Sequence, residues 1–329
     1  MDKQTNPTLS IIIVNYNVKE ELVNCIESIE HSIGSDKNPV SYEIIVSDNG
    51  SIDGSVEAVR EKFPWVKIIE NKANLGFGKA NNIGAQYAKG EVLFFLNPDT
   101  IIIQGISEMV RFLLDHPEVG LLGPVILDQN QKETTYSPAP VFISLFVQIA
   151  DLLLTPIVRF FFSYQKKIVS DCIRHNLPCK VKLIHGCAMM MRKETFIKIS
   201  GFNELLFMYG EEMEMSVKMK RYSYKVIIHP EGRIIHLGGR SSNKNLANIR
   251  STITGARALK LLLKLLFPYT WSIRYRIEML TQVRQIISSY INHRIMHMLG
   301  SHDDKHFIMM KKHINILKAL SSVLHENTP

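Results

Sequence analysis

Short apolar runs and amphipathic stretches alternate through the first hundred residues. The apolar runs predict buried strands, and they lie at residues 9–14, 42–47, 66–70 and 92–96. Helical periodicity fills the intervals, at residues 20–33, 55–63 and 78–88. Strands separated by helices are typical of right-handed βαβ units, so we expect an α/β fold with a mostly parallel central sheet.

The alternation becomes less regular after residue 100. The pattern predicts further helices at residues 105–115, 193–199 and 211–221, and further strands at residues 119–127, 182–192, 225–228 and 233–236. From about residue 245 the pattern is helical to the end. The sequence therefore predicts an α/β domain in residues 1–243 and a helical extension in residues 244–329.

Positive charge is concentrated in this extension. The whole chain has a net charge of +8, and residues 244–329 carry 13 Lys and Arg against 4 Asp and Glu. Basicity confined to one end indicates an anionic partner surface. The segment 258–267 is strongly apolar and lies near Arg257, Lys260 and Lys264, which suits a helix at a lipid interface. Packing of the same leucines on their own domain is the alternative.

Other features limit the class of protein. Gln148, Asp151 and Pro156 interrupt the apolar stretch 141–162, so we interpret it as amphipathic surface helices that touch a membrane or pack on the extension. Few aromatic side chains accompany the basic residues, which disfavours a nucleic-acid binder. The start of the chain is polar and the cysteines lack C-x-x-C spacing, which favours a reducing, cytoplasmic compartment. The cysteines are Cys25, Cys172, Cys179 and Cys187.

An aspartate follows the predicted strand 92–96. Asp99 stands in the segment Asn97-Pro98-Asp99-Thr100, and ligands of open α/β sheets bind outside the carboxyl ends of the strands. Hard divalent cations prefer oxygen ligands, so an aspartate here can hold a cation against the phosphates of a nucleotide. Taken alone, Asp99 could instead cap a helix or close a turn.

A second polar segment, residues 47–55, follows the strand 42–47. Its small residues and glycines let the backbone turn sharply and approach a ligand. Asp48 is placed to accept hydrogen bonds from a nucleotide base or ribose. Asp53 lies where a helix begins, which favours a capping role.

A third segment combines glycine and asparagine before the predicted helix 78–88. It contains Asn74, Gly76 and Asn81, and it matches neither G-x-G-x-x-G nor a P-loop. We expect a tight loop whose amides and side chains face a nucleotide.

Three acidic residues open the predicted helix 211–221. Glu211, Glu212 and Glu214 follow the apolar segment 207–210, and partial burial against it would raise a carboxyl pKa toward that of a general base. A solvated first helical turn is the alternative.

A histidine follows two isoleucines near the end of the α/β domain. Neutral imidazole is a good ligand for Mn²⁺, and His236 is followed by glycines and by Arg240 and Ser241, which are phosphate-binding residue types. A buried structural histidine is the alternative.

Taken in order, these segments resemble the family 2 glycosyltransferases of the GT-A fold, especially the bacterial rhamnosyltransferase-like branch. The resemblance covers roughly residues 9–242 and depends on eight motifs, which are Ile-Ile-Val-Asn-Tyr-Asn at 12–17, residues 47–55, Asn-Leu-Gly-Phe-Gly at 74–78, Asn-Pro-Asp-Thr at 97–100, residues 186–194, Gly-Phe-Asn-Glu at 201–204, residues 209–215 and residues 236–241.

The resemblance implies a role for each matching residue. Asp99 and His236 would hold Mg²⁺ or Mn²⁺, and Glu212 would be the catalytic base, a role that Glu211 or Glu214 could share or take. His185 and Cys187 stand where small residues are commoner, which would alter acceptor contacts. The residues implied to bind the nucleotide sugar are Tyr16, Asn17, Asp48, Asn49, Asn74, Gly76, Asn81, Asn97, Asp99, Arg240 and Ser241.

The resemblance also implies an inverting transfer from a nucleotide-diphosphate sugar. By resemblance alone, dTDP-rhamnose is the first expected donor. A saccharide, linked to polyprenyl diphosphate, is the expected acceptor at the inner face of the cell membrane. A nucleotidyltransferase and a non-catalytic membrane-associated scaffold are the alternatives. The first lacks support because no glycine-rich, arginine-bearing loop follows the first strand, where Asn15-Tyr16-Asn17-Val18 stands.

Overall fold

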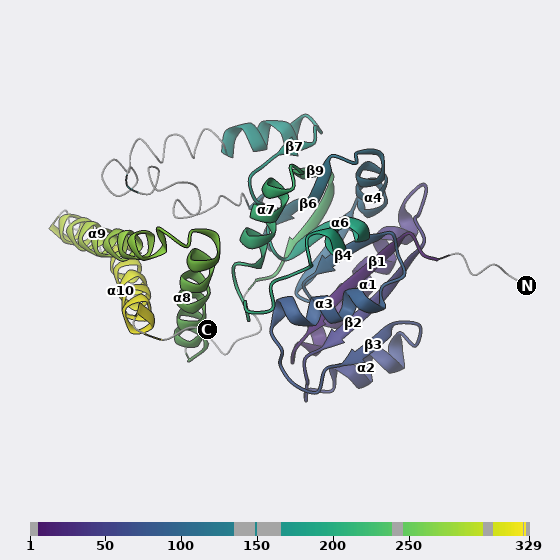
Figure 1. The fold of residues 1–329 in the computed structure, drawn as a ribbon, viewed down its shortest axis with the longest axis horizontal. Helices are drawn as coiled ribbons and strands as arrows, with labels where there is room; N and C mark the ends of the chain where they lie inside the picture. Colours follow the sequence, from purple (N-terminus) through teal and green to yellow (C-terminus); the bar gives the residue numbers. More distant parts are fainter. Residues whose placement is uncertain are drawn as a thin grey trace, which may run out of the picture. The chain divides into compact units, whose positions relative to one another are not determined.

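The computed structural model (Figure 1) describes residues 6–134, 149, 166–238, 246–298, 305–324 and 326. The chain divides into two compact units. One comprises residues 1–137, 166–207 and 211–241, and the other comprises residues 138–165, 208–210 and 242–329.

The first unit is built on one mixed sheet. Its parallel half has the order β3-β2-β1-β4, and these strands are β1 (Leu9–Asn15), β2 (Tyr42–Asp48), β3 (Lys67–Glu70) and β4 (Val92–Leu96). The sheet continues as β8-β6-β9-β5, with bounds β8 (Ala188–Arg192), β6 (Val119–Leu127), β9 (Lys225–His236) and β5 (Thr100–Gln104). A short strand, β7 (Cys179–Lys180), pairs with β9. The expected α/β fold is confirmed, and its sheet is parallel from β3 to β4 and mixed beyond β4.

Helices cover both faces of this sheet. The even side chains of β1, such as Ile12, pack with α3 (Phe77–Tyr87), α6 (Lys193–Lys198) and α7 (Glu211–Arg221). The odd side chains of β1 pack with α1 (Lys19–Ser35), α2 (Ser55–Lys62) and α4 (Ile106–Asp115). Both faces of the strand are therefore buried, which explains its unbroken apolar run.

The structure corrects three sequence expectations in the less regular part. The predicted strand 182–192 is shorter, because a turn at Gly186 precedes β8. The strands predicted at 225–228 and 233–236 form one strand, β9. The strand β5 was not predicted. It pairs with β9, which lies more than a hundred residues later in the chain. The local pattern of a five-residue segment does not indicate such a distant pairing partner.

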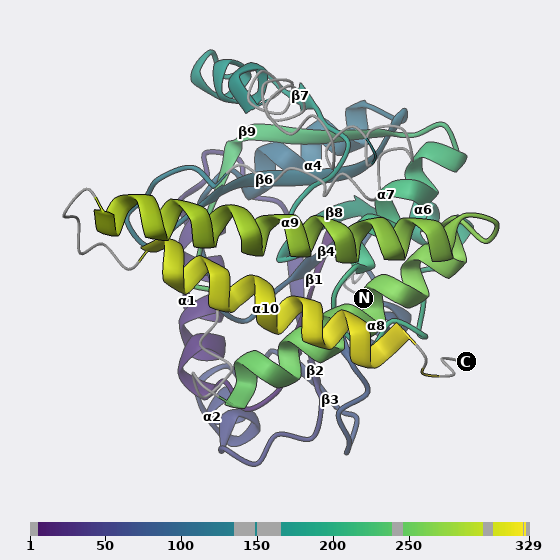
Figure 2. The same cartoon turned by 90° about the vertical axis from the view of Figure 1, so that its left-hand side faces the viewer.

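The described residues of the second unit form the helices α8 (Leu246–Leu266), α9 (Trp271–Met298) and α10 (Lys305–Leu324). Figure 2 shows α9, in yellow-green, next to α10, in yellow. Their shared core contains Leu263, Tyr275, Leu320 and Val323. The helical extension predicted from the sequence is therefore helical in the structure.

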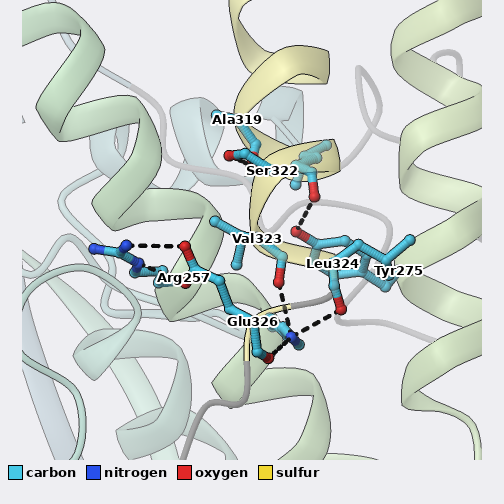
Figure 3. A network of polar contacts seen from close by, with 9 residues as sticks. Arg257, Tyr275, Ala319, Ser322, Val323, Leu324 and Glu326 are labelled. Atoms are coloured by element: carbon cyan, nitrogen blue, oxygen red, sulfur yellow. Dashed lines mark hydrogen bonds and ion pairs between the residues drawn. The ribbon is translucent and has the colours of Figure 1, made fainter.

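A buried lysine links α8 to the end of α10. Lys260 is 2% exposed, and its Nζ donates to the carbonyl oxygens of Val323 at 2.8 Å and Leu324 at 2.9 Å. These carbonyls belong to the last helical turn, where the C=O groups have no intrahelical N–H donors. Figure 3 shows the neighbouring ion pair between Arg257 and Glu326. The cation thus satisfies the helix end that it is buried against.

The structure distinguishes the alternatives for the segment 258–267. Leu263 is completely buried in the core of the second unit, so packing on its own unit is the observed role of this side chain. The apolar stretch 141–162, with its interpretation as surface helices, lies outside the described residues except for residue 149. Among the described residues, none of the helices is apolar over a length sufficient to cross a bilayer.

Candidate active site

A network of buried polar groups joins the carboxyl ends of β1 and β2. The Asn15 side-chain amide donates to Asp48 Oδ1 at 2.8 Å and to the hydroxyls of Ser51 and Ser55. Asp48 Oδ2 accepts the backbone N–H groups of Gly50 and Ser51, at 3.0 and 2.9 Å. Asp48 therefore holds the turn after β2 in shape. Contact of Asp48 with a nucleotide stays a prediction.

The turn after β1 is held against the same segment. Asn17 adopts a positive φ of 54°, and its Oδ1 accepts the N–H of Ile52 at 2.8 Å. Tyr16 is 46% exposed, so its ring is available at this edge of the sheet. Asp53 accepts the N–H groups of Lys19 and Ser55, which are the first residues of α1 and α2. The helix-start role predicted for Asp53 is confirmed.

The predicted asparagine–glycine loop lies beside this network. The Asn49 amide donates to Asn74 Oδ1 at 3.3 Å and to the Gly76 carbonyl at 3.2 Å. Gly76 has a φ of 84°, and the next N–H, of Phe77, donates to the Phe207 carbonyl at 2.8 Å. The loop is tight as expected, and the orientation of its amides and side chains toward a nucleotide stays a prediction.

We expect Gly76→Ala to destabilise the protein. A Cβ on Gly76 would lie 2.3 Å from the Phe207 carbonyl oxygen, and the positive φ adds strain. The expected loss in the free energy of unfolding is about 1–3 kcal/mol, measured by urea denaturation. Gly34→Ala is the matched control, since nothing lies within 4 Å of a Cβ there and the position is helical. Equal stability of the two variants would contradict the close packing at Gly76.

Asp99 and His236 meet at the end of the sheet. Thr100 pairs with His236 across β5 and β9, and the Leu237 N–H donates to the Asp99 carbonyl at 2.9 Å. This register brings His236 Nε2 to 3.3 Å from Asp99 Oδ1. The two side chains are 19% and 13% exposed, so the pair is sheltered but open to a ligand.

The residues present fit a divalent cation. Two adjacent ligands of an octahedral ion with bonds near 2.1 Å lie about 3 Å apart, which is close to the separation of Asp99 Oδ1 and His236 Nε2. A carboxylate and an imidazole suit Mn²⁺, and the carboxylate suits Mg²⁺. Asn97 brings a buried side-chain oxygen without a hydrogen-bond partner to the same segment. Metal binding itself stays a prediction.

The three glutamates of α7 differ in their surroundings. Glu214 pairs with Lys218 at 3.0 Å, and burial raises the pKa of its carboxyl group. Glu211 is 5% exposed. Glu212 is partly exposed, and a Cβ on Gly186 would lie 3.3 Å from its Oε2. Glu212 is therefore the member of the cluster whose carboxylate lies against the turn before β8.

The sequence motifs did not assign a metal-site role to two residues of that turn. The Cys187 carbonyl accepts the N–H of Asn97 at 2.8 Å, and the ring of His185 lies 5.1 Å from that of His236 between centroids. Burial and the neighbouring His236 lower the pKa of His185 to about 4, so this imidazole is neutral at neutral pH. Burial, followed by the charge of Asp99, raises the pKa of the Cys187 thiol.

The structure brings some of the other predicted site residues together and not others. The structure brings Asn97, Asp99 and His236 together at one end of the sheet, with Glu212 beside the adjoining turn. Asn81 is 1% exposed and donates to the Phe77 carbonyl within α3, and its contact with a nucleotide stays a prediction. Arg240 and Ser241 lie outside the described residues. Asn15 was not predicted, although a polar residue that ends an apolar strand is its visible signal.

An open sheet with the order β3-β2-β1-β4 and polar side chains at its carboxyl edge is typical of α/β proteins that bind a ligand at this edge. A sequence model described as "Glycosyl transferase family 2" matches residues 10–200. A second, "N-terminal domain of galactosyltransferase", matches residues 170–238. The first match covers more than half of the chain, and the chain belongs to glycosyltransferase family 2.

Individual relatives agree with this family. The chain is 26% identical over 258 residues to an N-acetylglucosaminyl-diphospho-decaprenol L-rhamnosyltransferase of Mycobacterium tuberculosis, covering 73% of this chain and 79% of the relative. It is 27% identical over 227 residues to the low-salt glycan biosynthesis hexosyltransferase Agl10 of Haloferax volcanii, covering 66% of this chain and 63% of that one.

Solved structures share the fold. The mannosyltransferase PcManGT from Pyrobaculum calidifontis, in complex with GDP-Man and Mn²⁺, has a TM-score of 0.60 at 13% identity, over 99% of this chain and 89% of its own. GalNAc-T7 with UDP, GalNAc and Mn²⁺ has a TM-score of 0.51 at 16% identity, over 78% and 48%. The protein is thus a glycosyltransferase with the GT-A fold, as its sequence motifs predicted.

Proposed function

We propose that the protein is a metal-dependent inverting glycosyltransferase in which Asp99 and His236 hold Mg²⁺ or Mn²⁺ and Glu212 is the catalytic base. The observation that supports this most is the 3.3 Å separation of Asp99 Oδ1 and His236 Nε2. Glu212 lies against Gly186, one residue from the Cys187 carbonyl that is bonded to Asn97. Asp99, His236 and the partly exposed Glu212 thus lie near the turn before β8.

The proposed chemistry assigns a task to each part. When bound, the ion offsets the negative charge that develops on the leaving diphosphate. Glu212 accepts the proton of an acceptor hydroxyl while that oxygen attacks the anomeric carbon. The bond from the anomeric carbon to the diphosphate oxygen breaks in the same step, which inverts the anomeric configuration. Tyr16, Asn49 and Gly76 lie by the carboxyl ends of β1 and β2, where the nucleoside would bind.

The relatives support the proposed donor and acceptor. One relative is named as an L-rhamnosyltransferase that acts on a decaprenol-linked diphosphosugar, and one solved neighbour holds GDP-Man. We therefore propose a nucleotide-diphosphate sugar as donor, with dTDP-rhamnose first. A saccharide linked to polyprenyl diphosphate is the proposed acceptor, in the synthesis of a cell-surface polysaccharide.

A panel of nucleotide sugars tests the donor directly. We expect slow hydrolysis of one donor with Mg²⁺ or Mn²⁺, lost in EDTA and restored by either ion, with dTDP-rhamnose preferred. Release of the nucleoside diphosphate is the measurement. Binding without hydrolysis or transfer would favour the scaffold alternative, whereas release of diphosphate from a nucleoside triphosphate would favour a nucleotidyltransferase.

We further propose that α9 lies on an anionic membrane surface on the cytoplasmic side. Exposed apolar side chains recur along one face of this helix. They are 38–53% exposed and belong to Ile273, Leu280, Val283, Ile287, Tyr290 and Ile291. Arg276 and Arg294 are exposed on the same face by their spacing. An apolar stripe flanked by arginines is typical of interfacial helices, and a membrane location would suit a lipid-linked acceptor.

Vesicle binding tests this surface. The double substitution Leu280→Ser and Ile287→Ser should weaken binding to phosphatidylglycerol-containing vesicles at least about tenfold, because each leucine-sized side chain transferred from water contributes roughly 1.5–3 kcal/mol. Sedimentation with vesicles at several salt concentrations is the measurement. Ile197→Ser, at a 65% exposed position of α6, is the control. Unchanged binding of the double variant would exclude this face of α9.

A further inference from the structure

Three residues that can bind a soft metal gather at the turn before β8. One imidazole nitrogen of His185, one of His236 and the Cys187 thiol all lie within 4.8 Å of one another. The group therefore offers two nitrogens and one sulfur. Asp99 Oδ1 lies 3.3 Å from His236 Nε2 but is not part of this group.

The backbone holds this group in place from three sides. Cys187 accepts the N–H of Asn97, and its own N–H donates to His185 Nδ1 at 3.3 Å. Ala188, the next residue, pairs with Leu96 in the sheet. His236 is fixed by its pairing with Thr100. A cation would thus meet ligands that the fold has already positioned, which lowers the entropic cost of binding.

The ligand types select the class of cation. Cys187 is 1% exposed and free of any disulfide, and packing as a small apolar residue explains its burial. It does not explain why its sulfur faces two imidazoles. Thiolate and imidazole are the ligands of Zn²⁺ and Co²⁺, whereas Mg²⁺ takes oxygen ligands.

We propose that His185, Cys187 and His236 supply three ligands of a tetrahedral site for a thiophilic divalent cation of the zinc class, with the fourth position left to solvent. Binding releases the thiol proton of Cys187 to the solvent, and the thiolate coordinates the ion. Because His236 is shared, this cation excludes Mg²⁺ or Mn²⁺ from the proposed catalytic position. Binding of the zinc-class cation is independent of the proposed function. Inhibition of sugar transfer by this cation rests on the proposed function.

Cobalt titration of the metal-free full-length protein tests the site. We expect a thiolate-to-Co²⁺ charge-transfer band in the near ultraviolet and intense visible bands of a tetrahedral ion, all removed by equimolar Zn²⁺. Cys187→Ser should lose the charge-transfer band, and His185→Gln should weaken Co²⁺ affinity at least about tenfold. Circular dichroism verifies folding of each variant. The His185 variant keeps the test valid if the serine variant does not fold.

Cys172→Ser is the matched control, because Cys172 lies elsewhere in the first unit, near Cys179. We expect it to keep the band. A band that survives in Cys187→Ser and disappears in Cys172→Ser would overturn the proposal, as would the absence of any band in the unsubstituted protein.

Mn²⁺ paramagnetic resonance separates this proposal from the proposed function. We expect Zn²⁺ to displace bound Mn²⁺ from the unsubstituted protein at concentrations at least tenfold lower than from Cys187→Ser. Failure to bind Mn²⁺ together with a normal cobalt band would refute the proposed catalytic ion and leave the soft site intact. Equal displacement from both proteins would show that Cys187 is not a ligand.

Discussion

Glu212→Gln is expected to abolish sugar transfer and to leave donor binding unchanged. The glutamine keeps the shape of the side chain against Gly186 but cannot accept a proton. Loss of a general base typically lowers the rate about 10²–10⁴-fold, and the affinity for the nucleotide does not depend on this group. Initial rates of transfer, with donor affinity from calorimetry, measure the two effects separately.

Two further substitutions complete this test. If Glu211→Gln loses transfer and Glu212→Gln keeps it, Glu211 is the catalytic base. Glu118→Gln is the control, since Glu118 is exposed and pairs only weakly with Lys225 at 3.3 Å. Full turnover of Glu212→Gln would transfer the role of base to another member of the α7 cluster.

Asp99→Asn is expected to remove metal-dependent donor binding. The amide keeps the volume of the side chain but loses the charge that pairs with a cation, and the backbone bond from Leu237 to the Asp99 carbonyl remains. Loss of outer-shell partners alone lowers metal affinity about 10–100-fold, so loss of a direct ligand should exceed roughly 100-fold. Calorimetric titration of the nucleoside diphosphate with and without Mn²⁺ is the measurement.

The control for this variant is the titration without metal. Nucleotide affinity in EDTA should be the same for Asp99→Asn and for the unsubstituted protein, because the groups that contact the nucleoside are unchanged. Equal affinity in the presence of Mn²⁺ would show that Asp99 is not a metal ligand, and the 3.3 Å contact with His236 would then be a structural ion pair.

The parallel half of the sheet could be predicted from local pattern. In β1, β2 and β4 both faces are buried, so each strand is an apolar run that ends at a polar residue. Strand ends of this kind also marked Asp48 and Asp99. The predicted helix 211–221 has the observed bounds of α7, because charged residues and a periodic apolar face define it locally.

The pairing in the other half of the sheet, β8-β6-β9-β5, could not be predicted in this way, although its strand at residues 119–127 was predicted with the observed bounds of β6. Its strands pair across long intervals, as Thr100 with His236 and Leu96 with Ala188. No local periodicity encodes which strand becomes the neighbour. The meeting of Asp99 and His236 was therefore expected from the resemblance and not from spacing. The soft ligands His185 and Cys187 became meaningful only when the register placed them beside His236.

The strand order also determines when the metal-binding end can form during synthesis. A nascent chain that has emerged through β4 already contains β3, β2, β1 and β4, with the loops proposed to bind the nucleoside. Asp99 can pair with His236 only after β8, α7 and β9 have left the ribosome. Long-range pairing of this kind is slow compared with local helix formation. The growing polypeptide therefore contains Asn15 and Asp48 well before it can assemble the proposed ion-binding end, and the loop at Gly76 gains its contact with the Phe207 carbonyl only in between.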